Sequence, residues 1–224
     1  MKKLRRFVLL SGIGFLTALS ACGGGSSDSA SASKPTTPKV IVAYGDSLTH
    51  GGAYVTPDQL WVRKMATQIQ ADGIDSKASV TVVNQSISGE TTTQALARLP
   101  GVLAAQRPTH IFLAHGTNDI WWECPGCYAR TQQNLQQMAN LATAAGAKVI
   151  MTDFTFKIRG DAEAQAFSAM YSQVAKASNG TYLQIVAGIP LDGTNYHPEL
   201  VHLRDVAQEA LKNNAVRALY ATLK

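Results

Sequence analysis

The chain alternates between short apolar runs and longer segments of mixed polarity. Five runs rich in Val, Ile and Leu are apolar at nearly every position, which is typical of parallel strands buried on both faces of a sheet. We predict strands at residues 40–44, 80–83, 110–114, 147–152 and 181–186.

The segments between and after these runs have the length and composition of helices. We predict helices over residues 58–72, 91–106, 130–145, 161–178 and 204–222. Gly146 and Gly180 each follow one of them, where a glycine commonly ends a helix. The alternation predicts an α/β domain with a doubly wound parallel sheet and helices on both faces. In such sheets the functional site lies at the carboxyl ends of the strands.

The N-terminal residues have a different pattern. Residues 1–6 are basic and residues 7–19 are apolar, the order found in a signal peptide, and the apolar stretch is short for a membrane-spanning helix. Leu19-Ser20-Ala21-Cys22 follows and resembles the lipobox of bacterial lipoproteins, in which the Cys is lipidated and becomes the new N-terminus. An ordinary secreted protein with a stray Cys is the alternative.

The segment after Cys22 is rich in Gly, Ser and Pro, which is typical of a flexible tether. We therefore predict a signal peptide at 1–21, a lipidated Cys22 with its tether at 22–38, and one folded domain at 39–224. Gly23, rather than Asp, follows the Cys, and by analogy with lipoproteins this favours the outer membrane. The expected location is the bacterial cell envelope, with the domain facing the periplasm or the cell surface.

Composition narrows the classes of function. A chain of 224 residues suits one α/β domain with a short appendage. The formal net charge is +5, but four of the 20 basic residues lie in the predicted signal peptide, which leaves 16 against 15 acidic residues. No Lys/Arg stripe with interleaved aromatic residues occurs, so nucleic acid is not an expected partner.

Polar blocks follow the predicted strands, and a further block precedes the last predicted helix. A lone Gly-Asp-Ser is ordinary turn chemistry, but here four blocks occur in order. They are Gly45-Asp46-Ser47-Leu48, Ser88-Gly89-Glu90-Thr91, Gly116-Thr117-Asn118-Asp119 and Glu199-Leu200-Val201-His202. Together they resemble the GDSL/SGNH family of serine hydrolases.

The resemblance covers residues 39–222 and is closest to the periplasmic thioesterase/lysophospholipase and arylesterase branch. The runs Asn84–Pro100 and Ala166–Tyr171 look much like that branch. It implies a three-layer α/β/α sandwich with a five-stranded parallel sheet, the flavodoxin-like SGNH hydrolase fold. It also implies a carboxylic ester hydrolase that uses no metal and no organic cofactor.

The resemblance assigns roles to five residues. Ser47 matches the nucleophile, and His202 matches the general base that removes its proton. Glu199 would orient the imidazole. The backbone N–H groups of Ser47 and Gly89 and the side-chain amide of Asn118 would form the oxyanion hole.

The last block departs from the family pattern, which is normally Asp-x-x-His. Here a Glu stands at the acid position, and its longer side chain must fold differently. A competing pair lies upstream, Asp192 and His197, with a spacing that is wrong by two residues. We prefer His202 because the sequence after it matches the family's final helix without a gap. Two other histidines near strand ends, His50 and His115, are interpreted as polar loop residues.

The segment 120–130 is unusual because it combines cysteines with aromatic residues. In an oxidising periplasm, Cys124 and Cys127 are expected to form a small disulfide. A redox pair and free thiols are the alternatives, and two thiols alone make a poor zinc site. Trp121, Trp122 and Tyr128 either shape a substrate pocket or pack the loop.

The sequence thus predicts a lipid-anchored serine esterase. The expected substrates are small esters or lipids, including thioesters and lysophospholipids. Three alternatives remain open: a carbohydrate O-acetyl esterase of the envelope, a non-catalytic envelope-binding lipoprotein with the same fold, and a redox lipoprotein using Cys124 and Cys127.

Overall fold

The computed structural model describes residues 38–73, 79–121, 127–155 and 160–223. The predicted signal peptide, Cys22 and nearly all of the predicted tether lie outside these residues, so their boundaries stay predictions. Among the described residues, no helix is both long enough and apolar enough to cross a membrane.

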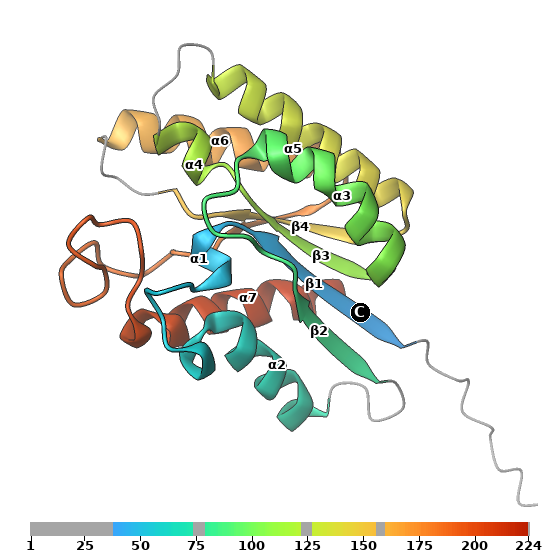
Figure 1. Ribbon diagram of the computed structural model, residues 1–224, viewed down its shortest axis with the longest axis horizontal. Helices are drawn as coiled ribbons and strands as arrows, with labels where there is room; N and C mark the ends of the chain where they lie inside the picture. The colour runs from blue at the N-terminus through green and yellow to red at the C-terminus, as the bar shows by residue number, and fades with distance from the viewer. Residues whose placement is uncertain (1–37, 74–78, 122–126, 156–159, 224) are drawn as a thin grey trace, which may run out of the picture. The chain divides into compact units, whose positions relative to one another are not determined.

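The domain is built on one parallel sheet of five strands in the order β2-β1-β3-β4-β5 (Figure 1). This is the flavodoxin-like order, and it confirms the predicted fold class. The strands are β1 (Lys39–Gly45), β2 (Val80–Asn84), β3 (His110–Ala114), β4 (Lys148–Asp153) and β5 (Thr181–Gln184). The central strand β3 is buried throughout, whereas the edge strands β2 and β5 are only partly covered.

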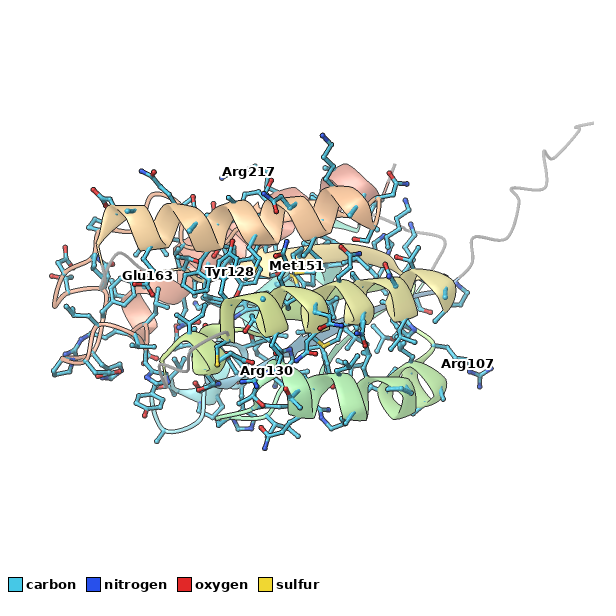
Figure 2. All side chains as sticks on the ribbon, turned by 90° about the horizontal axis from the view of Figure 1, so that it is seen from above. Arg107, Tyr128, Arg130, Met151, Glu163 and Arg217 are labelled. Carbon is cyan, nitrogen blue, oxygen red and sulfur yellow. The ribbon has the colours of Figure 1, made fainter. Side chains whose placement is uncertain are left out.

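Helices cover both faces of the sheet (Figure 1). One face carries α2 (Trp61–Asp72) and α7 (Gln208–Thr222), and the other carries α3 (Thr92–Gln106), α5 (Cys127–Ala144) and α6 (Asp161–Ala177). Residues of β1 alternate between the two cores: Ile41 packs toward α2 and α7, and Val42 toward the other three helices. Figure 2 looks onto this three-helix layer, with α3, α5 and α6 running side by side above the sheet.

Several predicted boundaries differ from the observed ones. The helices predicted from residues 58 and 204 each begin as a separate 3₁₀ turn, η1 (Pro57–Gln59) and η3 (Asp205–Ala207). The strand predicted to reach residue 186 ends at Gln184, because the chain turns there. The short helix α4 (Thr117–Trp121) was not predicted, since five residues are too few to show a helical period.

The expected role of Gly180 as a helix cap is wrong. Asn179 adopts the left-handed conformation after α6, with φ 52°, as Asn often does at this position. Gly180 is needed for another reason: a Cβ there would lie 2.9 Å from the carbonyl oxygen of Val149 on β4. Gly146 does adopt a positive φ, 87°, two residues after the end of α5.

Candidate active site

Ser47 lies at the carboxyl end of β1 and is the first residue of α1 (Ser47–His50). The fully buried Asp46 caps this turn, and its Oδ1 accepts a hydrogen bond from the Leu48 N–H at 3.0 Å. Gly45 is required by close packing, because a Cβ there would lie 2.9 Å from the Ala114 carbonyl oxygen of β3. The turn therefore holds the Ser47 side chain at the end of the sheet where the sequence placed the chemistry.

His202 connects Ser47 to Glu199. Its Nε2 lies 2.9 Å from the Ser47 Oγ, and its Nδ1 lies 2.9 Å from the Glu199 Oε1. The same Glu199 oxygen accepts the backbone N–H of His202 at 3.2 Å. In the neutral imidazole, Nδ1–H donates to the carboxylate and Nε2 accepts the serine hydroxyl. The longer Glu side chain thus folds back on its own loop and reaches the ring.

The electrostatics of this pair leave His202 neutral near pH 7. Burial lowers the pKa of His202 below its usual 6.5, and the nearby Glu199 offsets only part of that effect. Burial also works to raise the pKa of Glu199, but hydrogen bonds from the backbone and from the His202 ring outweigh it and lower that pKa. A neutral imidazole beside an ionised carboxylate is the arrangement that a general base needs.

The competing pair has other contacts. The Nε2 of His197 lies 3.0 Å from the backbone carbonyl oxygen of Tyr54, which it can only reach as a donor. The Oδ1 of Asp192 accepts the N–H groups of Thr194 and Asn195 at 3.1 and 3.0 Å. Both residues therefore organise loops, and the geometry brings His202 and Glu199 to Ser47 instead.

Gly89 and Asn118 meet at Glu90. Gly89 has φ 78°, a conformation that favours glycine, in a turn closed by the Glu90 N–H donating to the Ile87 carbonyl at 3.2 Å. The side-chain amide of Asn118, on α4, donates to the Glu90 carbonyl at 3.0 Å. Its contact with Asp46 Oδ2 is long, at 3.4 Å. The Asn118 amide is thus hydrogen-bonded to the residue that directly follows Gly89.

Asp46 and Asp119 lie behind this arrangement. Burial is the main cause that raises the pKa of Asp46 to about 7, with Asp119 and Glu90 adding to it. Asp119 accepts the Thr92 hydroxyl at 2.6 Å and the Thr92 N–H at 2.8 Å. The residue beside Asn118 therefore fastens α4 to the first turn of α3.

A buried charge cluster supports Glu90, and sequence reasoning missed it. Arg98 donates to both carboxylate oxygens of Glu90, at 2.8 and 2.6 Å, and to the Gln85 carbonyl at 2.9 Å. The Nε2 of His115 lies 2.9 Å from the same carboxylate. Burial works to raise the pKa of Glu90, but the hydrogen bonds from Arg98 and His115 lower it to about 2.

His115 lies between β3 and α4, outside helix and strand as predicted, but its side chain is buried and contacts Glu90. It packs edge-on against Tyr44, with ring centroids 4.8 Å apart. His50 is exposed, but it is the last residue of α1 rather than a loop residue, and its Nδ1 lies 3.2 Å from the Ser88 Oγ.

The unusual segment is described only in part. Cys124, Trp122 and the side chain of Trp121 lie outside the described residues, so the predicted disulfide stays a prediction. Cys127 is buried at the start of α5, with the Arg130 Nη2 3.1 Å from its Sγ. Tyr128 packs between α5 and α6 (Figure 2): its hydroxyl donates to the Ala166 carbonyl at 2.9 Å. No group of three potential metal ligands occurs in the described part of the chain.

Comparison with known proteins identifies related enzymes. Residues 43–210 match the GDSL-like Lipase/Acylhydrolase family. Esterase TesA of Pseudomonas aeruginosa is 32% identical over 170 residues, which cover 72% of this chain and 81% of that protein. Thioesterase 1/protease 1/lysophospholipase L1 of Escherichia coli K12 is 33% identical over 138 residues, 61% of each chain. A crystal structure of TesA superimposes with a TM-score of 0.71 at 28% identity, covering 82% of this chain and 99% of the other.

Proposed function

Because this chain belongs to the GDSL-like lipase/acylhydrolase family, and so is a serine hydrolase of carboxylic esters, we propose that Ser47 is its nucleophile and His202 its general base. Glu199 orients the imidazole and stabilises its protonated form. The observation that carries this proposal is the continuous chain from Ser47 Oγ to His202 Nε2 and from His202 Nδ1 to Glu199 Oε1, with 2.9 Å at each step.

The reaction proceeds in two halves. Ser47 Oγ attacks the ester carbonyl carbon while its proton passes to His202 Nε2, and the leaving alcohol takes that proton as its bond to the acyl carbon breaks. Water then attacks the acyl-serine, giving its proton to His202, which returns it to Ser47 as the acid departs. The imidazole is protonated while each tetrahedral intermediate exists, and each half of the reaction ends with it neutral again.

Negative charge builds on the carbonyl oxygen in both halves. The N–H groups of Ser47 and Gly89 and one N–H of Asn118 supply the donors. Since the other N–H of Asn118 is held by the Glu90 carbonyl, the amide is oriented before substrate arrives. Such preorganised donors are each worth roughly 100- to 1,000-fold in rate.

The substrate class follows from the related enzymes. Their names indicate an esterase and a thioesterase/lysophospholipase, and we extend this range to small acyl esters, thioesters and lysophospholipids for this chain. Esters of graded acyl-chain length, a thioester, a lysophospholipid and an O-acetylated sugar should be assayed side by side. Preferential cleavage of the sugar ester would favour the alternative activity on envelope carbohydrate.

The catalytic assignment is tested with Ser47→Ala and His202→Ala, each beside a matched control. Ser88→Ala removes a nearby exposed serine, and His50→Ala removes an exposed histidine of α1. We expect both catalytic variants to lose activity to near background and both controls to keep most of it. Full activity in Ser47→Ala, or loss confined to His197→Ala, would overturn the assignment.

Two further proposals concern the envelope. Lipidation of Cys22 is supported by the lipobox-like sequence, and Cys22→Ser should abolish incorporation of labelled fatty acid into the full chain. A Cys124–Cys127 disulfide is supported by their spacing and the expected oxidising compartment. Titration of thiols in the unfolded protein, with and without reductant, should reveal two extra thiols only after reduction.

A further inference from the structure

Tyr54 lies flat against the imidazole of His202. The two ring centroids are 3.5 Å apart and the planes differ by only 5°. Tyr54 belongs to the loop after α1, whereas His202 precedes η3, so the stack joins segments nearly 150 residues apart in the chain. The edge of the imidazole faces Ser47 and Glu199, and one of its faces is covered by the phenol ring.

The backbone of Tyr54 is held from two sides. Its N–H donates to the Gly51 carbonyl at 3.1 Å, and its carbonyl accepts the Nε2–H of His197 at 3.0 Å. The N–H of His197 in turn donates to the carbonyl of His202 at 2.9 Å. His197 therefore connects the segment that carries His202 with the loop that carries Tyr54.

A second connection holds the end of the same loop. The N–H and hydroxyl of Thr56 both donate to the carboxylate of Asp205, at 3.0 and 2.8 Å. Asp205 begins η3, three residues after His202. The loop is thus fastened on both sides of the stacked pair, so the position of Tyr54 follows the position of His202.

The stacked Tyr54 ring restricts tilting of the His202 imidazole, a motion that the hydrogen bonds in the plane of the ring leave open. The bonds from Nδ1 and Nε2 fix the rotation of the imidazole within its plane, but they resist tilting of that plane only weakly. A ring stacked on one face resists tilting. It also presents a π face to the imidazolium that forms when Ser47 attacks, an interaction worth about 2- to 30-fold in a rate or equilibrium.

Resting on the proposed function above, we propose that Tyr54 is a positioning residue for the general base. Its ring keeps the imidazole of His202 aligned with Ser47 and stabilises the protonated ring, and His197 holds Tyr54 in place. Tyr54 acts through His202 and needs no contact with the reacting atoms.

The aromatic ring rather than the hydroxyl is the required part, which sets the design of the test. We compare Tyr54→Phe with Tyr54→Leu, and use Tyr128→Leu as a matched control, because Tyr54 and Tyr128 are 40% and 38% exposed. We expect Tyr54→Phe to retain activity within about 2-fold of the wild type. Tyr54→Leu should lower kcat by about 5- to 30-fold with little change in KM. Tyr128→Leu should leave both constants nearly unchanged.

A pH profile supplies a readout that a purely structural role would not move. The charged and titratable groups that face the His202 ring are Glu199 and His197 on its own segment, with Tyr54 covering one face. Leu keeps apolar cover over the ring but offers no π face to stabilise the imidazolium, so Tyr54→Leu should lower the pKa of His202 and shift the acid limb of kcat/KM to lower pH. His197→Ala should shift kcat in the same direction as Tyr54→Leu, but by less.

The results for the Tyr54 variants can be distinguished from a failure of the catalytic assignment of Ser47 and His202. Wild-type kcat and an unchanged acid limb in Tyr54→Leu would overturn the positioning role while leaving Ser47 and His202 in place. Equal losses in Tyr54→Phe and Tyr54→Leu would also overturn it, because the hydroxyl would then be the essential group. All variants should be checked for unchanged thermal unfolding before their kinetics are compared.

Discussion

The side-chain amide of Asn118 donates to the backbone carbonyl of Glu90 at 3.0 Å. Glu90 directly follows Gly89, so this hydrogen bond connects the Asn118 amide to the turn that contains Gly89. The two proposed oxyanion-hole residues are therefore held by one local structure.

Replacing Asn118 by Ala should lower kcat by about 100- to 1,000-fold while KM changes little, because the donor acts mainly on the transition state. Asn118 is only partly buried, so the variant should fold with nearly wild-type stability. Steady-state kinetics and a denaturation curve check the two halves of this prediction. A rise in KM with kcat intact would assign Asn118 to substrate binding instead.

Arg98→Ala should both destabilise the fold and slow catalysis. Glu90 is 5% exposed and Arg98 is 27% exposed, and removing the guanidinium leaves a buried carboxylate with only His115 as a partner. We expect a loss of about 3 kcal/mol in the free energy of unfolding, measured in urea. Arg98→Lys should recover only part of it, since an ammonium cannot reproduce the two-point contact.

The same carboxylate predicts a pH dependence of stability. The pKa of Glu90 is lowered from 4.5 to about 2 in the folded protein. The contribution of ionised Glu90 to the free energy of unfolding is therefore complete above pH 4.5 and is lost as the pH falls toward about 2. The difference in unfolding free energy between the wild type and Glu90→Gln should therefore narrow over that interval. A difference that stays constant across it would contradict the low pKa.

Glu199→Gln should change the pH profile as well as the rate. Glu199 is the group that raises the pKa of His202 against the effect of burial, so its neutral replacement should move the acid limb of kcat/KM further below 6.5. We expect kcat to fall by at least about 100-fold, because the imidazolium loses its partner. An acid limb that moves upward would show that another acid faces His202.

Gly116→Ala tests the packing behind the site. Gly116 has φ 129°, and a Cβ there would overlap the hydroxyl of Tyr171, which donates to the His115 carbonyl. Strain and overpacking together should cost about 1–3 kcal/mol in thermal or chemical unfolding. Gly101→Ala is the matched control, since a Cβ at Gly101 meets nothing within 4 Å.

The sheet could be predicted because its central strands are apolar on both faces, which only burial on both sides explains. The blocks that contain Gly89 and Asn118 could be identified because they occur in the same order along the chain as the short motifs of the family. The α4 helix could not, because it consists of five residues and leaves no periodic signal.

The contacts that support the site could not be predicted from the sequence either. Glu90 and Arg98 are eight residues apart, and their pairing depends on the turn that precedes α3. The preference for His202 over His197 rests on the gap-free match of the following sequence to the family's final helix. In the fold, the antiparallel bridge between Tyr196 and Leu203 sets the two histidines side by side, but the Nε2 of His197 contacts the Tyr54 carbonyl whereas that of His202 contacts Ser47.

The direction of β1 has a practical consequence. Lys39 begins the strand and Ser47 follows its end, so seven residues, or about 23 Å of extended chain, separate the start of the strand from the proposed nucleophile. Material joined ahead of Lys39, whether a bead, a surface or a fusion partner, attaches at the amino end of β1, remote from Ser47. This enzyme is therefore suited to immobilisation through its N-terminal side, with substrate still free to reach the serine.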